Sequence, residues 1–373
     1  MCFPLHVSST AWFPMSMSTP DLLAESDLAA CREALRHGSR SFHAASHLLP
    51  MSLRDGATAL YGFCREADDA IDQTDRPAEA LVLLRERLRC LHAGMPFDLA
   101  CDRAFSAVVR RYGIPEEIPA ALLEGFAWDA ENRRYADFPS LLSYAARVAG
   151  TVGVMMACVM GVEKPGLLAR ASDLGVAMQL TNIARDVGED ARAGRLYLPL
   201  AWLEAEGIDA SEWMAAPVFN PGIARVVARL LEAAETLYRK AEDGIAGLPL
   251  ACRPAMYAAR YLYAGIGHQV ARNGFDSVST RARVSRPRKL WHLTRAIAAT
   301  PGLPSRDHSP TVPEAMFLVR AVAGPAADAL GMPHRTSIPW WNLDARVERL
   351  IAIFERLERR ERDSDPIRFF EAS

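Results

Sequence analysis

Two clusters of aspartates are the residues of this chain whose types and spacing could do chemistry. The first cluster lies within residues 61–72 and the second within residues 179–190. On a helix, two aspartates four positions apart lie on one face, one turn from each other. Like charges placed in this way repel, and they repel more strongly when buried. Because both clusters occur in otherwise apolar helical sequence, we expect a bound cation between two aspartate pairs, Asp68 with Asp72 and Asp186 with Asp190.

Each cluster also carries other polar side chains at helical spacing. On the first predicted helix, one face is shared at a 4-3-4 spacing, and Asp69 lies about 100° further round. The residues of that face are Tyr61, Arg65, Asp68 and Asp72. A single ridge of the second predicted helix carries Gln179, Asn182, Asp186 and Asp190.

Local electrostatics oppose this arrangement. Both aspartate pairs fall near the C-terminal end of a predicted helix, where the helix dipole disfavours negative charge. Violations of this kind are expected at functional sites. Mg²⁺ would resolve the conflict, because it takes oxygen ligands and bridges carboxylates to substrate phosphates. We therefore predict a Mg²⁺ or Mn²⁺ site facing a diphosphate, with ligands Asp68, Asp72, Asn182, Asp186 and Asp190.

An arginine precedes the acids at a matched offset in each cluster, Arg65 in the first and Arg185 in the second. Guanidinium groups donate paired hydrogen bonds to phosphate oxygens. The alternative is that these are solvated helix faces with ordinary salt bridges. That alternative explains a single cluster well, but it explains two matched clusters poorly.

Composition excludes several classes of protein. The chain has 373 residues, of which 50% are hydrophobic and 24% charged, and its net charge is −2. No global basic field attracts nucleic acid, so we expect no nucleic-acid partner. The seven cysteines are scattered and form no Cys-x-x-Cys pair, which argues against a zinc site or a disulfide framework and for a reducing compartment. The N-terminus shows no signal peptide, so we expect a cytoplasmic protein.

Hydrophobic periodicity predicts an all-α protein. Apolar residues recur at three and four positions from Asp21 to Trp291, and proline and glycine breakers divide this range into about eight to ten helices. Ser52 with Asp55 resembles a capping box that starts the first acidic helix, and Gly194 is a plausible stop for the second. The longest apolar stretch, residues 141–162, reads as a buried helix rather than a membrane span.

We expect three regions along the chain. Residues 1–20 form a disordered extension, residues 21–296 a catalytic domain, and residues 297–373 a proline-rich linker with an amphipathic C-terminal helix. That last helix, at about residues 344–362, could dock on the core, on a partner or on a membrane surface.

At its acidic clusters the chain resembles the squalene/phytoene synthase family, whose members are all-helical enzymes of the class I isoprenoid synthase fold. The resemblance spans roughly residues 28–295. Its first motif reads Cys64-Arg65-x-x-Asp68-Asp69-x-x-Asp72. Its second reads Asn182-x-x-Arg185-Asp186-x-x-Glu189-Asp190, followed by Gly194-Arg195-Leu196-Tyr197-Leu198-Pro199. Similar segments also occur around Ser39 and Ser41 and from Tyr144 to Gly153.

The resemblance implies roles for individual residues. It implies a helical bundle around a central cavity, with Asp68, Asp69, Asp72, Asp186, Asp190, Tyr61, Arg65 and Arg185 in catalysis. It implies substrate binding by Ser39, Ser41, Tyr144, Gln179, Asn182, Tyr263 and Arg281. Arg283 is close enough to Arg281 to leave their alignment open.

Within the family, the wording of the second motif is most similar to that of bacterial phytoene synthases. This similarity implies a prenyltransferase that joins two geranylgeranyl diphosphates head to head, through a cyclopropyl diphosphate, to give phytoene in carotenoid biosynthesis. One alternative is a head-to-head synthase for C15 substrates that makes squalene, dehydrosqualene or presqualene diphosphate. A class I terpene cyclase and a non-catalytic relative that acts as an assembly factor are further alternatives.

The lipophilic substrates suggest a further hypothesis, peripheral contact with the inner membrane.

Overall fold

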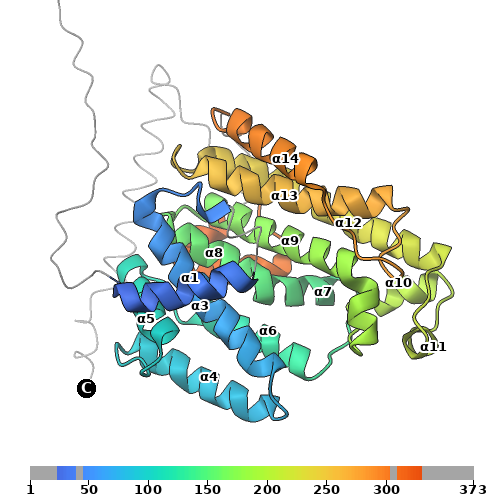
Figure 1. The fold of residues 1–373 in the computed structure, drawn as a ribbon, viewed down its shortest axis with the longest axis horizontal. Helices are drawn as coiled ribbons and strands as arrows, with labels where there is room; N and C mark the ends of the chain where they lie inside the picture. Colours follow the sequence, from blue (N-terminus) through green and yellow to red (C-terminus); the bar gives the residue numbers. More distant parts are fainter. Residues whose placement is uncertain (1–22, 39–44, 303–308, 330–373) are drawn as a thin grey trace, which may run out of the picture. The chain divides into compact units, whose positions relative to one another are not determined.

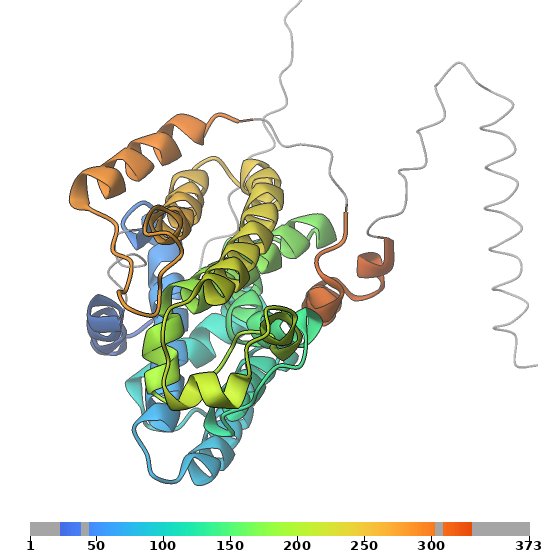
Figure 2. The same cartoon turned by 90° about the vertical axis from the view of Figure 1, so that its right-hand side faces the viewer.

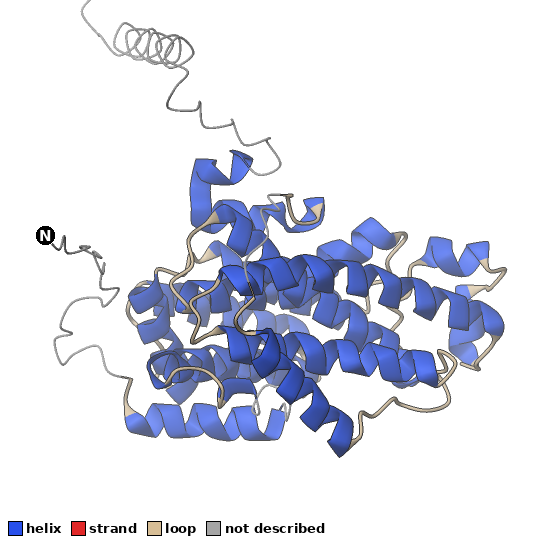
Figure 3. Ribbon diagram, turned by 90° about the horizontal axis from the view of Figure 1, so that it is seen from above, coloured by secondary structure: helices blue, strands red, loops and turns tan. Residues whose placement is uncertain are grey.

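The computed structural model describes residues 23–38, 45–302 and 309–329, and every regular element in them is a helix (Figures 1 and 3). The predicted all-α class is therefore confirmed. The described ranges contain fourteen α-helices, together with one π-helix and two short 3₁₀ turns. Thirteen of these α-helices begin between Asp21 and Trp291, the range for which eight to ten were predicted. The predicted number was too low, because short helices flank the longer ones at bends that hydrophobic periodicity does not mark.

The helices follow the proline and glycine breakers closely. Their bounds are α1 (Glu25–Gly38), α3 (Met51–Asp72), α4 (Pro77–His92), α5 (Ala100–Tyr112), α6 (Glu117–Ala130), α7 (Phe138–Ala145), η2 (Ala146–Gly150), α8 (Thr151–Val159), α9 (Pro165–Arg192), α10 (Leu200–Ala205), α11 (Ala210–Ala215), α12 (Pro221–Gly247), α13 (Arg253–Arg272), α14 (Arg286–Ala299), η3 (Pro313–Ala315), α15 (Met316–Ala323) and η4 (Gly324–Ala329).

Helix α9 is the central element of the bundle. It packs against α12, α8, η2 and α13, and Figures 1 and 2 show it running between these neighbours. Two close approaches depend on glycine. A Cβ on Gly175 would lie 2.1 Å from the carbonyl oxygen of Ala149, and one on Gly153 would lie 2.2 Å from that of Ala171. These contacts let the α9 backbone lie directly against η2 and α8.

The long apolar stretch forms three consecutive helices rather than one. Phe138–Val159 is the one segment of the described ranges that is long and apolar enough to span a membrane by length and composition, and most of it is buried within the bundle. Its middle turn, η2, is a π-helix, a feature that often occurs at functional sites. The sequence contained no signal for this turn.

Of the two predicted helix ends near the acidic clusters, the end of α9 is confirmed and the start of α3 was predicted from the wrong residue. Helix α3 begins at Met51 after Pro50, and no side chain caps it, so the predicted capping box was wrong. Pro50 sets the start instead, because a proline disfavours the helical conformation of the residue that precedes it. Gly194 does lie just beyond the end of α9, in a left-handed conformation with φ 81°, as predicted.

The chain beyond the predicted catalytic domain is attached to α9 through a buried ion pair. Arg170 lies 2.9 Å from Asp173, and both side chains are almost fully buried. Arg170 also donates to the Ser309 hydroxyl at 3.0 Å, and the Thr311 hydroxyl donates to Asp173 at 2.6 Å. The predicted end of the catalytic domain, residue 296, falls within helix α14. Beyond it, α15 packs against α9 and α6. The predicted N-terminal extension and the predicted helix at 344–362 lie outside the described residues.

We predict that Gly175→Ala destabilises the protein by about 1–3 kcal/mol, because the added methyl group would overlap the carbonyl oxygen of Ala149 and force two helices apart. Urea unfolding followed by circular dichroism would measure the loss. Gly267→Ala is the matched control, since its Cβ would meet only the flexible end of Leu231, at 3.0 Å. Equal stability of the two variants would contradict the proposed backbone contact.

Candidate active site

The first acidic cluster lies at the C-terminal end of α3. Arg65 donates from Nε to Asp69 at 3.0 Å and from Nη1 to Asp68 at 3.3 Å, so one guanidinium bridges two carboxylates. Asp69 faces a pocket of about 370 Å³ that is also lined by Ala30, Ala34, Glu66, Ala100 and Cys101. Asp69 therefore lies partly on a different side of the helix from Asp68, as its position along the helix predicts.

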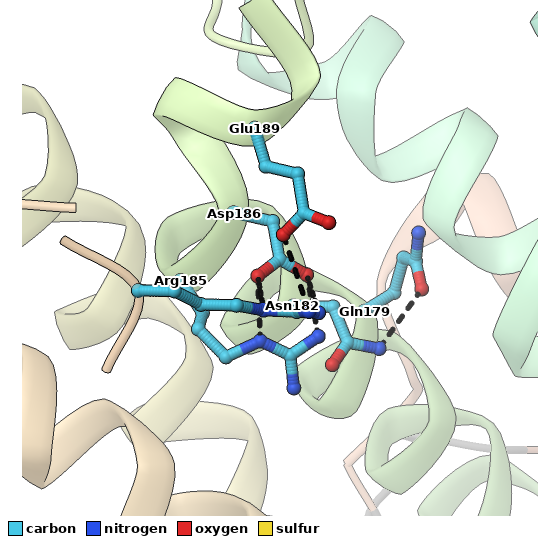
Figure 4. A network of polar contacts seen from close by, with 6 residues as sticks. Gln179, Asn182, Arg185, Asp186 and Glu189 are labelled. Carbon is cyan, nitrogen blue, oxygen red and sulfur yellow. Dashed lines mark hydrogen bonds and ion pairs between the residues drawn. The ribbon is translucent and has the colours of Figure 1, made fainter. Parts of the chain in front are cut away.

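The second acidic cluster lies on the last turns of α9 (Figure 4). Asp186 accepts hydrogen bonds from two arginines. Arg185 donates from Nε at 2.7 Å, and Arg281 donates from Nε at 2.8 Å and from Nη2 at 3.1 Å. Arg281 also pairs with Glu189 at 3.2 Å. The structure thus brings Arg281 to the second cluster and favours it over Arg283 in the alignment that the sequence left open.

The two clusters meet through Arg195, which follows the second motif. Its guanidinium donates to Asp72 at 2.7 Å, and its backbone N–H donates to the carbonyl oxygen of Asp190 at 2.8 Å. The end of α3 and the end of α9 therefore lie next to each other. The tertiary structure brings together aspartates that are more than one hundred positions apart in the chain.

Asp129, at the end of α6, lies near both clusters and was not predicted. Its carboxylate accepts hydrogen bonds from the hydroxyls of Tyr144, at 2.8 Å, and Tyr197, at 2.7 Å. These two rings stack with centroids 5.2 Å apart, and Tyr135 lies against both of them. Asp129 is a single aspartate outside either motif, so the sequence does not mark it, and only the positions of its tyrosine partners identify it.

Burial and mutual repulsion perturb the carboxylates of this region. Burial and the negative charge of Asp72 together raise the pKa of Asp68 to about 6, although the positive charge of Arg65 opposes the shift. Burial, with Asp186 adding, raises the pKa of Asp190 to about 7. The charge of Asp129 contributes to both shifts, so both clusters lie within electrostatic reach of the same carboxylate.

Other predicted side chains surround the clusters. Burial raises the pKa of Tyr61 to about 12. The charge of Arg65 opposes this shift and Tyr263 adds to it, so Tyr61 lies near both residues. Gln179 and Asn182 lie next to each other one to two turns before Asp186, with Nδ2 of Asn182 3.5 Å from Oε1 of Gln179 (Figure 4). Tyr144 is almost fully buried and contacts the site through Asp129. Ser39 and Ser41 lie outside the described residues.

Comparison with known proteins decides the family. Residues 35–288 match squalene/phytoene synthase. This chain belongs to the squalene/phytoene synthase family.

Two relatives in the squalene/phytoene synthase family match most of the chain. A phytoene synthase of Cereibacter sphaeroides is 48% identical over 91% of this chain and 96% of its own. A phytoene synthase of Rhodobacter capsulatus is 49% identical over 81% of this chain and 91% of its own. Among solved structures, a dehydrosqualene synthase crystallised with a ligand superposes with a TM-score of 0.66 at 28% identity, covering 74% of this chain and 96% of that one. The predicted fold and family membership are confirmed.

The donor set of this squalene/phytoene synthase site fits a hard divalent cation. Both clusters present oxygen donors, and burial, with a neighbouring carboxylate adding, raises the pKa values of Asp68 and Asp190, a cost to the charged forms that a cation would offset. As they stand, no three His, Cys, Asp or Glu side chains of the described ranges converge closely enough to form a metal site. In the structure these carboxylates accept hydrogen bonds from four arginines, namely Arg65, Arg185, Arg195 and Arg281.

We predict that Tyr197→Phe destabilises the protein by about 1–3 kcal/mol, because it leaves the buried Asp129 carboxylate with one hydrogen bond fewer. Tyr135→Phe is the matched control. Tyr135 lies in the same ring cluster, but its buried hydroxyl has no hydrogen-bond partner among the described residues, so its removal should cost little. Urea denaturation would compare the two variants, and a larger loss for Tyr135→Phe would contradict the assigned role of Asp129.

Proposed function

We propose that this chain is a prenyltransferase that condenses two geranylgeranyl diphosphates head to head to form phytoene. One diphosphate leaves the first substrate, the double bond of the second attacks the allylic cation, and loss of a proton closes the ring to give a cyclopropyl diphosphate. Loss of the second diphosphate, rearrangement and loss of a proton then give phytoene. No step needs a reductant. The observation that carries the proposal is the junction of the two acidic clusters at Arg195, at the ends of α3 and α9.

The residues of the site divide into two groups. The carboxylates of Asp68, Asp72, Asp186 and Asp190, with the amide of Asn182, would hold Mg²⁺ or Mn²⁺. When bound, such an ion neutralises the departing diphosphate as a Lewis acid. Arg65, Arg185 and Arg281 would donate to the diphosphate oxygens as negative charge develops there. In the structure these guanidinium groups rest on the same aspartates, within reach of the place where a diphosphate would bind.

Water exclusion is the second requirement, because an allylic cation reacts with any water nearby. The apolar segment α7–η2–α8 packs against α9, and it includes Tyr144, which donates to Asp129. Its residues are mostly Ala, Val, Gly and Met. This segment is therefore suited to enclose prenyl chains as well as to pack the core.

The substrate is proposed as C20 rather than C15. The relatives from Cereibacter and Rhodobacter, which are named phytoene synthases, support this choice. The solved structure of a dehydrosqualene synthase, at lower identity, keeps a C15 synthase as the second candidate. We further propose a cytoplasmic location with peripheral contact to the inner membrane, because both substrate and product are lipophilic.

We predict that purified protein with Mg²⁺ converts geranylgeranyl diphosphate to phytoene and leaves farnesyl diphosphate largely unchanged. Mass spectrometry of the hydrocarbon extract from each separate incubation would identify the product. A C30 product alone would transfer the assignment to the C15 candidate. A cyclic product from a single substrate molecule would indicate a cyclase.

We predict that Asp68→Asn and Asp186→Asn each lower turnover about a hundredfold or more while the fold is retained. Each change removes a carboxylate from the proposed metal site, where Lewis-acid stabilisation is worth several kcal/mol. Steady-state assays with circular dichroism would test this. Asp98→Asn is the control, because Asp98 is a fully exposed aspartate that pairs only with Arg103 at the surface.

A thermal-shift measurement distinguishes loss of metal binding from loss of the fold in these variants. Mg²⁺ should raise the melting temperature of the wild type and of Asp98→Asn, because a ligand that binds only the folded state stabilises it. The shift should be smaller in Asp186→Asn. Wild-type turnover in either Asp68→Asn or Asp186→Asn would refute the metal assignment.

A further inference from the structure

Helix α14 and the segment before it carry a concentration of positive charge. Residues 277–302 contain six arginine or lysine residues and no aspartate or glutamate, in a chain whose net charge is −2. Arg281 is engaged at the active site by Asp186, while Arg286, Arg288, Lys289 and Arg295 lie on α14 itself. No other long helix of the described ranges lacks acidic residues while carrying four cations.

The same helix exposes large apolar side chains. Trp291 is 66% exposed, Leu290 64% and Ile297 58%. At 100° per residue, Leu290, Thr294 and Ile297 fall on one line along the helix, and Trp291 lies beside them. Arg286 lies on the same line, one turn before Leu290, and Lys289 lies to one side of it, so the outward face combines an apolar stripe with two cations.

The inward face of α14 packs against α13 (Figure 1). His292 lies against Gly265, where a Cβ would come within 2.5 Å of its ring nitrogen. Arg295 stacks over the Tyr261 ring at 4.2 Å, and Arg288 donates to Gln269 at 2.6 Å. These contacts set the rotation of α14, so its apolar stripe points away from the bundle.

We propose that the outward face of α14 docks on the surface of an anionic lipid bilayer. A basic helix with Trp and Leu on one face lies in the membrane interface, and cations near the surface add attraction to anionic headgroups. Charge complementarity favours this occupant. A second copy of the chain carries net charge −2 spread over its length, and the predicted helix at 344–362 has acidic and basic residues in nearly equal numbers, so neither offers a comparable negative field.

The inference deepens the peripheral membrane contact proposed above by naming its surface. It places the bilayer on the outer side of α13, the helix that also carries Tyr263 of the candidate site. Its test measures binding rather than turnover, so failure of the docking proposal is distinguishable from failure of the proposed reaction.

The experiment is vesicle co-sedimentation of the full chain with phosphatidylcholine vesicles, with and without phosphatidylglycerol. Leu290→Ser/Trp291→Ser should lower binding to the anionic vesicles at least about tenfold. Arg286→Gln/Lys289→Gln should lower it by roughly fivefold for each cation removed, and should weaken its dependence on salt.

Val82→Ser/Leu83→Ser is the matched control. These neighbours on α4 are 66% and 52% exposed, but Glu79 and Glu86 share their helix, so binding should stay at the wild-type level. Circular dichroism and phytoene formation in detergent should be unchanged in the α14 variants, because no residue changed there belongs to the site.

Three outcomes would overturn the proposal. The first is equal sedimentation of the wild type and Leu290→Ser/Trp291→Ser. The second is loss of vesicle binding on removal of residues 331–373 with α14 intact, which would make the C-terminal segment the anchor. The third is a dimer in analytical ultracentrifugation that Leu290→Ser/Trp291→Ser dissociates without any vesicle binding by the wild type.

Discussion

The concentration of negative charge between the ends of α3 and α9 is the constraint on which this molecule depends. Burial raises the pKa values of Asp68 and Asp190, and nearby aspartates from both helices, together with Asp129 from α6, add to both shifts. Such a cluster destabilises a fold unless positive charge accompanies it. Arg65, Arg185, Arg195 and Arg281 supply that charge here. In the proposed function the carboxylates of this cluster would hold the metal, and Arg65, Arg185 and Arg281 would donate to the diphosphate.

The rest of the bundle holds this charge in place. Glycines at 153 and 175 let α9 lie directly against η2 and α8, which sets the direction in which its last turns point. The stacked rings of Tyr144 and Tyr197 hold Asp129 behind the clusters through two hydrogen bonds. The buried Arg170–Asp173 pair ties the chain beyond residue 308 to the same helix. Repulsive groups are thus held close together by close helix packing, stacked rings and a buried ion pair.

Several features could be predicted because they depend on neighbours in the sequence. The all-α class follows from hydrophobic spacing, the end of α9 follows from Gly194, and the acidic motifs are local patterns that identify the family. The start of α3 was predicted wrongly, because Pro50 rather than a Ser52 cap sets it. The π-helix η2 escaped prediction, since its extra residue per turn leaves no trace in a spacing of three and four. The predicted roles of Ser39 and Ser41 fall outside the described residues.

The sequence by itself determined the chemistry: which side chains carry oxygen donors, which carry guanidinium groups, and on which helical faces they lie. These are properties of residue type and of 3.6-residue periodicity, so they hold before the helices meet. Only the tertiary structure decided that Arg195 joins the two clusters, that Asp129 belongs with them, and that the apolar stripe of α14 faces outward. Those facts depend on contacts between residues far apart in the chain, and local sequence does not encode the distance between such residues.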